Sequence, residues 1–244
     1  AIFKDVPSTF APISDIPVPA DYRIAAGDTL VVQLYGKRNV EYRLVVTREG
    51  RVLVPEVGPV DVAGLAFDEV KSLIADGFEQ RVIGARAVVT MGELRALQVR
   101  LAGDVVKPGV YTVSALSGLV DALLATGGIQ YTGSLRDIQV KRHGRLVARY
   151  DLYDLLLRGD TAADITLQHN DVIFVPPLGD TVYIGGEVQR PGIYELRSER
   201  TLEDVLALAG GLTATASIKD SLIERIIPGS YRTLVSLDRR RPLK

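Results

Sequence analysis

Val99-Arg-Leu-Ala-Gly103-Asp-Val-Val-Lys-Pro108-Gly109-Val-Tyr111 and Val182-Tyr-Ile-Gly-Gly186-Glu-Val-Gln-Arg-Pro191-Gly192-Ile-Tyr194 are two versions of one segment, spaced 83 residues apart. The match continues without a gap, so that residues 99–142 are identical to residues 182–225 at 15 of 44 positions. Self-similarity at a fixed spacing is the signature of a duplicated structural unit. The sequence therefore predicts two copies of one small module.

Each copy begins as a strand, a turn, a second strand and a helix. A short apolar run is followed by Pro-Gly, in which Pro fixes φ and Gly tolerates positive φ, and then by a strand at 110–113 or 193–196. Ser117 is expected to cap the first helix, whereas Thr201 and Asp204 resemble a capping box ahead of the second. Both helices are expected to end at a Gly-Gly pair in the left-handed conformation.

The first copy then continues to a closing strand. We expect a hairpin turn at His143-Gly144, a helix from Asp151 to Arg158, and a last strand directly after Asn170-Asp171. The result is a β-β-α-β-β module with a sheet packed on a helix, as in a β-grasp. The second copy has a hairpin around Pro228-Gly229 but no counterpart of the closing strand.

The missing strand has a consequence for the end of the chain. An open sheet edge invites pairing with another chain. We therefore expect the sequence to be a fragment, whose residues after Asp238 are disordered or are completed by another molecule.

The N-terminal part predicts a different module. Residues 1–20 are Pro-rich and read as an extended arm. A Gly27-Asp28 turn precedes a strand at 29–34, and Asp28 repeats the position of Asp171. Residues 40–46 and 51–55 are expected to pair as a hairpin, and residues 85–90 to form another strand. A helix follows residue 64, with its apolar face formed by Phe67, Val70, Leu73 or Ile74, and Phe78.

Composition excludes several classes of function. The 29 Lys and Arg residues nearly balance the 30 Asp and Glu residues, so no broad field favours nucleic acid or an anionic membrane. Cysteine is absent and the two histidines are His143 and His169, so thiol nucleophiles and Cys/His metal sites are excluded. No apolar stretch is long enough to span a bilayer. No cofactor and no metal are expected.

Several residue groups have both a functional and a structural interpretation. The Gly-Asp and Asn-Asp pairs could hold a cation or could form backbone turns, and the acid pairs Asp151/Asp154 and Glu203/Asp204 could act on glycosides or complement helix dipoles. The matched tyrosines could stack on sugars or pack half-buried. The basic residues Arg136, Lys141, Arg142 and Arg145 could line a path for an acidic polymer or be ordinary surface charges. The structural interpretation is favoured for each group.

The motif order resembles a known family. Tyr22-x-x-x-x-Gly27-Asp28-x-Leu30, followed by Glu49-Gly50, Pro55-x-x-Gly58 and Val62-x-Gly64-Leu65, is similar to the export domain of outer-membrane polysaccharide exporters of the Wza type. The duplicated Gly-x-Val-x-x-Pro-Gly-x-Tyr unit resembles the SLBB, or soluble ligand-binding β-grasp, domain that follows it in those proteins.

The resemblance implies a periplasmic, non-catalytic protein that forms a homo-oligomeric ring. Such a ring would conduct a capsular polysaccharide or exopolysaccharide from an inner-membrane co-polymerase to the outer membrane. Two family features are absent from this sequence, the lipobox cysteine and the C-terminal amphipathic helix, so the resemblance implies association with the outer membrane through regions outside it. Ala66 replaces a hydroxyl residue that often caps the helix of the export domain.

The expected fold class is α+β, a small export domain with a mixed sheet and a helix followed by two tandem β-grasp-like SLBB modules. The expected domains are an arm at 1–20, an export domain at 21–95, a first SLBB module at 96–178 and a truncated second one at 179–244. Two alternatives remain, a monomeric glycan-binding protein and an enzyme acting on glycan. No catalytic residue is expected, and the residues expected to shape the backbone are Gly27, Asp28, Pro55, Gly58, Gly64, Gly103, Pro108, Gly109, Tyr111, Gly127, Gly128, Asp171, Gly186, Pro191, Gly192, Tyr194, Gly210 and Gly211.

Overall fold

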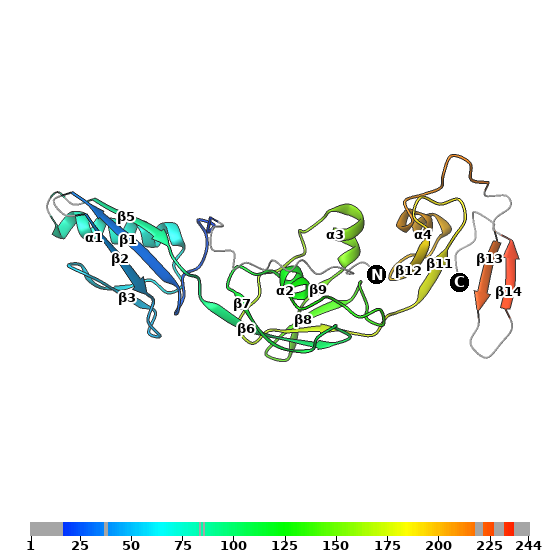
Figure 1. Cartoon of the computed structure of the whole chain (residues 1–244), viewed down its shortest axis with the longest axis horizontal. Helices are drawn as coiled ribbons and strands as arrows, with labels where there is room; N and C mark the ends of the chain where they lie inside the picture. The colour runs from blue at the N-terminus through cyan, green and yellow to red at the C-terminus, as the bar shows by residue number, and fades with distance from the viewer. Residues whose placement is uncertain are drawn as a thin grey trace.

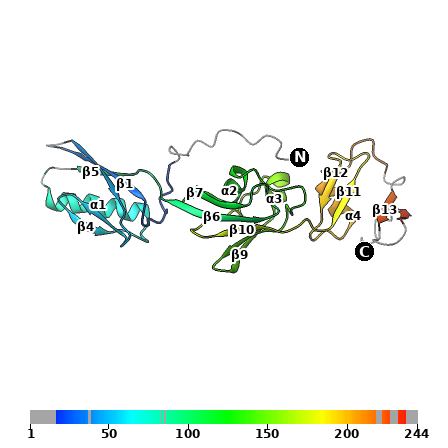
Figure 2. The ribbon, with the colours of Figure 1, turned by 60° about the horizontal axis from the view of Figure 1, so that its bottom comes forward.

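The chain folds into a row of three α+β units. The computed structural model describes residues 17–36, 39–82, 84, 86–217, 222–226 and 232–236. An N-terminal unit lies at one end, the first repeat at the centre and the second repeat at the other end (Figures 1 and 2). Each unit has its own buried apolar cluster. The α+β class expected from the sequence is confirmed, and residues 1–16 of the expected arm lie outside the described residues.

The N-terminal unit is built on β1 (Thr29–Tyr35), the central strand of a three-stranded antiparallel sheet. It pairs with β2 (Val40–Val45) on one side and with β5 (Arg86–Met91) on the other. The helix α1 (Phe67–Arg81) buries Phe67, Val70, Ile74 and Phe78, whereas Leu73 is exposed. Of the two alternatives offered by the sequence, Ile74 therefore faces the core.

The expected pairing of residues 40–46 with 51–55 is wrong. Strand β3 (Arg51–Val54) instead pairs with β4 (Gly58–Asp61), its next neighbour along the chain. Strand β2 is already paired with β1 along Thr29–Leu34. The turn between β2 and β3 is closed by a bond from Thr47 N to Arg51 O, 2.8 Å long, but the two strands belong to separate sheets.

The first repeat forms a five-stranded sheet in the order β7-β6-β10-β8-β9. Its strands are β6 (Ala96–Gly103), β7 (Gly109–Ser114), β8 (Ile138–Arg142), β9 (Arg145–Tyr150) and β10 (Val172–Val175). The last strand of the module, β10, lies in the middle of the sheet, parallel to β6 and antiparallel to β8. It therefore joins the β6–β7 and β8–β9 hairpins into one sheet, and the His143-Gly144 turn expected between β8 and β9 is confirmed.

Among the described residues, the second repeat contains the same two hairpins and no strand between them. Strand β11 (Thr181–Ile184) pairs with β12 (Gly192–Glu195), and β13 (Leu222–Ile226) pairs with β14 (Arg232–Ser236). In the described residues these hairpins are two separate two-stranded sheets. The Pro228-Gly229 turn and the residues after Asp238 lie outside the described residues.

The short helices confirm most of the expected end signals. α2 (Leu119–Ala125) and α4 (Leu202–Leu208) are each followed by two glycines with positive φ, at 127–128 and 210–211. Thr201 and Asp204 form the expected capping box. α3 (Leu152–Arg158) begins after Asp151 and ends at Gly159, as expected.

The prediction that Ser117 caps α2 is wrong. The carboxylate of Asp164, 45 residues away in the sequence, accepts hydrogen bonds from Leu119 N at 2.9 Å and from Val120 N at 3.4 Å. This acceptor comes from the loop before β10, which passes the beginning of the helix. Among the helices in the described residues, none combines the length and the apolar character needed to cross a lipid bilayer.

Candidate functional site

The junction between the two repeats is the largest buried polar cluster among the described residues. The first repeat contributes Ser134, Arg136, Asp151 and Tyr153, and the second contributes Glu195 at the end of β12 and Glu199 in the segment that follows. Arg136, Asp151 and Glu195 are each at least 94% buried. Charged groups this far from water persist only when they are paired, so the partners of each one define the site. We call this set of residues the ionic joint.

Arg136 holds the ionic joint together. Its Nε donates to the Asp151 carboxylate at 3.0 Å, and its Nη1 donates to Glu199 Oε1 at 2.8 Å and to the Glu195 carbonyl at 3.0 Å. The guanidinium also lies over the Tyr153 ring, 4.7 Å from its centre. Burial lowers the pKa of Arg136, but the hydrogen bonds to the two carboxylates outweigh this effect and raise it. The guanidinium therefore stays charged and links three segments.

Glu195 completes the ionic joint from the second repeat. Its carboxylate accepts hydrogen bonds from Ser134 Oγ at 2.7 Å, Leu135 N at 2.9 Å and Gly179 N at 3.1 Å. The backbone N–H of Glu195 donates to Tyr153 Oη at 3.0 Å. Every one of these bonds joins the end of β12 to the first repeat or to the connection between the repeats. Because the partners are buried, the two repeats are fixed in one relative orientation.

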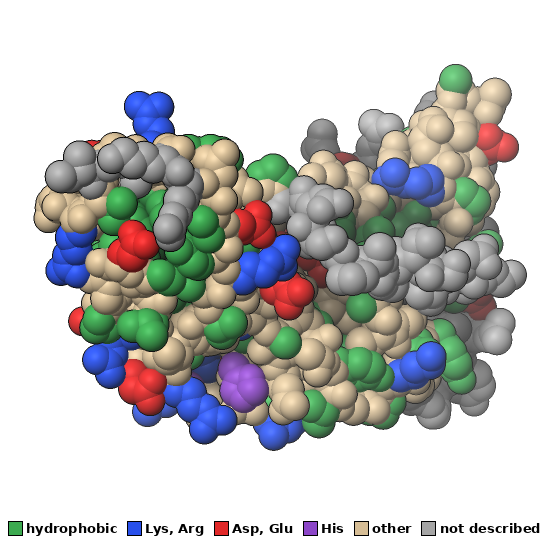
Figure 3. All heavy atoms as spheres, turned by 60° about the vertical axis from the view of Figure 1, so that its left-hand side comes forward, with side chains coloured by type: hydrophobic (Ala, Val, Ile, Leu, Met, Phe, Trp, Pro, Cys, Tyr) green, Lys and Arg blue, Asp and Glu red, His purple; other side chains and the backbone are tan. Residues whose placement is uncertain are grey.

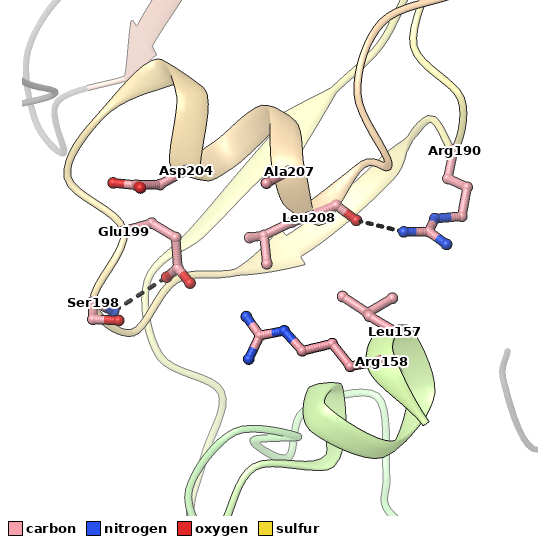
Figure 4. Close-up of a pocket in the computed structure, with 8 residues that line it drawn as sticks. All are labelled: Leu157, Arg158, Arg190, Ser198, Glu199, Asp204, Ala207 and Leu208. Carbon is pink, nitrogen blue, oxygen red and sulfur yellow. Dashed lines mark hydrogen bonds between the residues drawn. The ribbon is translucent and has the colours of Figure 1, made fainter. Parts of the chain in front are cut away.

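A polar cleft lies beside the ionic joint. It has a volume of about 310 Å³ and runs between the end of α3 and the helix α4 (Figure 4). In Figure 4 the Arg158 side chain extends from α3 toward the side of Glu199, whereas the Arg190 side chain points at the Leu208 carbonyl, to which it donates a hydrogen bond of 3.3 Å. The cleft is lined by Leu157, Arg158, Arg190, Ser198, Glu199, Asp204, Ala207 and Leu208.

The acidic groups of the cleft are already engaged. Asp204 accepts bonds from Arg200 N and Thr201 N, each at 3.0 Å, because it caps α4. Glu199 is bound by Arg136 and by Arg197 N. Burial raises the pKa of Glu199, but hydrogen bonds from Arg197 N and from the Arg136 guanidinium together lower it. The cleft offers hydrogen bonds to a ligand rather than a free acid and base.

The Gly27-Asp28 and Asn170-Asp171 pairs form backbone turns, the structural alternative offered by the sequence. Asp28 and Asp171 are fully buried, and each accepts a bond from the N–H three residues before it, at 2.9 and 2.8 Å. Each is also paired with an arginine, Arg95 at 2.7 Å and Arg142 at 2.8 Å. The cation beside each carboxylate is thus a guanidinium. In the described residues no group of three or more acidic or histidine side chains is arranged to hold a metal ion.

The matched tyrosines close their own Pro-Gly turns. Tyr111 Oη donates to Lys107 O at 2.8 Å, and Tyr194 Oη donates to Arg190 O at 2.6 Å. Both rings are half-buried, as the structural interpretation has it. The Tyr194 ring also meets Tyr153 edge to face, with 6.4 Å between centres.

The other expected backbone residues lie in turns or at the ends of elements. Pro55 is in the β3–β4 turn, Pro108 and Pro191 directly precede β7 and β12, and Gly109 and Gly192 are the first residues of these strands. Positive φ is found at Gly27, Gly58, Gly64, Gly103, Gly127, Gly128, Gly186, Gly210 and Gly211.

The prediction that Arg136 and Arg142 are ordinary surface charges is wrong. Arg136 is buried in the ionic joint, and Arg142 donates from Nε and Nη2 to the two carboxylate oxygens of Asp171. Only the internal match of Arg142 to Arg225 hinted at such a role. Lys141 lies 4.5 Å from the centre of the Phe174 ring, and Arg145 is exposed. On the face shown in Figure 3, basic and acidic side chains are interspersed.

In the acid pairs Asp151/Asp154 and Glu203/Asp204, three of the four carboxylates bind caps or arginines. Asp151 caps α3 through Tyr153 N and binds Arg136, whereas Asp154 binds Arg158. Asp204 belongs to the capping box of α4. His143 lies in the β8–β9 turn, and His169 Nδ1 accepts a bond from Gln98 N at 3.3 Å. The structure does not bring the two histidines together with a nucleophile.

Three consecutive segments of the chain match known protein families. Residues 16–92 match the polysaccharide biosynthesis/export protein family. Residues 97–175 and 181–233 each match an SLBB domain. The three matches follow the order of the three buried clusters.

Curated relatives are about a third identical to this chain over the aligned region. The polysialic acid transport protein KpsD of Escherichia coli is 31% identical over 180 residues, which are 72% of this chain and 32% of the relative. The EPS I polysaccharide export outer membrane protein EpsA of Ralstonia nicotianae is 31% identical over 177 residues, 71% of this chain and 46% of the relative. The chain thus spans between a third and a half of the length of these relatives.

Proposed function

This chain belongs to the polysaccharide biosynthesis/export proteins that carry SLBB domains, and from that premise we propose that it is a non-catalytic scaffold in a complex that exports capsular polysaccharide or exopolysaccharide. The observation that carries this proposal is the order of the three domains, an export domain followed by two SLBB domains. The matched relatives, which are named as a transport protein and an export protein, align with about 180 residues of this chain.

The two junctions between the units support a role as a scaffold. The ionic joint fixes the second repeat on the first. Between the N-terminal unit and the first repeat, Leu97 and Ala115 belong to the apolar core of the N-terminal unit. Buried, hydrogen-bonded junctions limit the relative motion of the units, which suits a part that bridges two layers of a complex.

The cell compartment and the partners are part of the same proposal. The full-length protein works in the periplasm, associates with the outer membrane through regions outside this chain, and assembles with copies of itself into a ring. Its cargo is the polysaccharide, and an inner-membrane co-polymerase delivers that cargo.

Deletion of the gene in a polymer-producing strain tests the exporter role. The expected result is polymer that is still synthesised but is retained inside the cell envelope, with surface polymer restored by the full-length gene. Unchanged surface polymer in the deletion strain would refute the proposal. Light scattering on the full-length protein tests the ring, which predicts large oligomers, whereas monomers at high concentration would count against it.

A second candidate function is a monomeric glycan-binding protein, and the polar cleft beside the ionic joint favours it. Calorimetry with short oligosaccharides separates the two functions. A scaffold for passing cargo binds such oligosaccharides weakly, whereas a receptor binds them with Kd values of about 1 μM or below, a binding free energy of about −8 kcal/mol. Turnover of purified polymer would instead indicate an enzyme.

A further inference from the structure

The sheet of the first repeat has one side covered by helices and one side that faces solvent. The helices α2 and α3 pack on the covered side, where Val99, Val140 and Ile173 are fully buried (Figure 1). Successive side chains of a strand point to opposite sides of its sheet, so the neighbours of these residues point away from the helices. We call this second side the outer face.

The sheet carries basic residues and no acidic ones. Its five strands contain no Asp or Glu but five basic residues, namely Arg100, Lys141, Arg142, Arg145 and Arg149. Arg142 and Arg149 are paired with acidic residues that lie outside the strands. Within the described residues, the other three have no ion pair. In a chain whose charges are otherwise balanced, the sheet therefore concentrates positive charge.

Two of the unpaired cations lie in one row across the outer face. The register places Arg100 of β6 and Lys141 of β8 on either side of Val172 of β10. Residues in register share a face, and neighbouring strands lie about 4.8 Å apart, so the two backbone positions are about 10 Å apart. Two positive charges thus flank a short apolar strip.

The side chains of this row are available to a ligand. The Lys141 ammonium lies 4.5 Å from the centre of the Phe174 ring, which attracts it and keeps it over the sheet. Arg100 is exposed and its guanidinium has no hydrogen bond within the described residues. The same holds for the side chains of Gln98 and Thr112, which pair with each other in the next row of β6 and β7. The outer face offers cations together with amide and hydroxyl groups.

We propose that the outer face binds an acidic polysaccharide, with Arg100 and Lys141 paired to carboxylates of its sugars. The proposal rests on the export function and names the chemical class of its cargo. Charge complementarity selects an anion, the two-strand spacing of the cations matches the length of two linked sugar rings, and the amide and hydroxyl groups bind sugar hydroxyls. A nucleic acid fits less well, because Lys141 already covers the ring of Phe174 on which a base would stack.

The second repeat provides an internal control. Tyr183 and Glu224 stand at the positions that Arg100 and Lys141 occupy in the first repeat. One cation is thus replaced by a neutral group and the other by an acid, which repels a carboxylate. An acidic polysaccharide should bind at the first repeat and leave β11 and β13 unaffected.

The test is an NMR titration of the chain with tetragalacturonate at low ionic strength. The acid is expected to shift the amides of β6, β8 and β10, whereas its methyl ester, which has the same rings without the charges, is expected to shift them far less. No change on the outer face in millimolar tetragalacturonate, or equal changes with the ester, would overturn the proposal. Equal binding of a thymidine oligonucleotide of the same charge would show a general anion surface and would overturn it too.

Charge-removing variants locate the site. Arg100→Gln and Lys141→Gln are each expected to weaken the binding of tetragalacturonate about fivefold, as loss of an exposed ion pair does. Arg145→Gln is the matched control, because it removes the same charge from the same sheet. Arg145 is in register with Arg142, whose side chain reaches the buried Asp171, so it lies on the other side. Equal weakening by the control would mean that only net charge matters and would contradict the site.

The deletion strain separates this inference from the export function. If the strain retains its polymer but the chain does not bind tetragalacturonate, the acidic-polysaccharide site is refuted and the export function stands. If surface polymer is unchanged in the strain, the export function is refuted, whatever the titration shows.

Discussion

The first repeat joins its two hairpins through β10 into a five-stranded sheet, whereas the described residues of the second repeat form two separate two-stranded sheets. The two repeats nevertheless share their Pro-Gly turns, their Gly-Gly helix ends and a glycine of positive φ at 103 and 186. The comparison teaches that local backbone chemistry builds each hairpin and helix by itself. Closing the module into one sheet requires a strand that is distant in sequence from both β6 and β7.

The junctions of the two repeats also differ at matching positions. Ala115 and Leu116 of the first repeat pack against the apolar core of the N-terminal unit. Ser198 and Glu199, 83 residues later, lie at the polar cleft and the ionic joint. The same structural position thus carries an apolar contact in one copy and an ion pair in the other, so salt and pH act mainly on the second junction.

The largest effect is expected from Arg136→Ala. It leaves the buried carboxylate of Glu199 without its cation and leaves Asp151 with only the more distant Arg197, 3.4 Å away, which costs about 3–5 kcal/mol of unfolding free energy. Urea unfolding measures this loss, and NMR relaxation should show the second repeat tumbling separately from the first. Arg145→Ala is the control, because Arg145 is exposed on β9. A loss equal to that of the control would mean that the ionic joint does not hold the repeats together.

The next effect distinguishes the two equivalent glycines. Gly103→Ala is expected to cost on the order of 3–4 kcal/mol, because the added Cβ collides with Val175 O and φ is positive. Gly186→Ala meets no described atom and carries only the strain of positive φ, about 1 kcal/mol. Amide hydrogen exchange, followed separately for the first and the second repeat, measures both losses of stability. Equal losses would show that the two repeats are closed in the same way.

A smaller effect is expected from Asp171→Asn. The substitution removes the charge that pairs with Arg142 but keeps an oxygen to accept Gln168 N. The expected loss is about 2 kcal/mol, less than for a fully buried pair, because Arg142 keeps part of its exposure. Asp28→Asn at the equivalent turn of the N-terminal unit should lose a similar amount. Protection of the β10 amides reports the first change, and an unaltered β10 would contradict the role given to this ion pair.

The smallest effect is the pH dependence of the ionic joint. The folded pKa of Glu199 lies below its ordinary value of 4.5. A lowered pKa stabilises the fold above the unfolded value, and this stabilisation is lost as the pH falls through the folded value. The junction should therefore loosen below pH 4.5, as followed by the amide shifts of residues 195–199. A Glu199→Gln variant should lack this transition, and an identical transition in it would assign the effect to another group.

Local features of the sequence were sufficient for much of the fold. The Pro-Gly turns, the Gly-Gly helix ends and the capping box at Thr201 depend on residues within a few positions of one another. Leu30, Val32 and Leu34 are buried on one face of β1, as the alternation of side chains along a strand requires. These features are set by backbone geometry and short-range periodicity, which a single sequence displays directly.

The failures concern contacts between distant residues. The cap of α2 comes from Asp164 rather than from Ser117, and β3 pairs with β4 rather than with β2. Arg136 was read as a surface charge because its partner Glu199 is 63 residues away, in the next repeat. No pattern within either segment shows that such groups meet, since the folded arrangement of the repeats decides it.

Amide hydrogen exchange of the chain tests the comparison between the repeats most directly. Arg100 and Asp104 are bonded to β10 and should exchange slowly, as members of a closed sheet. Tyr183 and Glu187 occupy the same positions on the edge of β11 that no described strand pairs with, and they should exchange far faster. Equal protection at the two pairs of positions would show that the second repeat is already closed and would contradict this account.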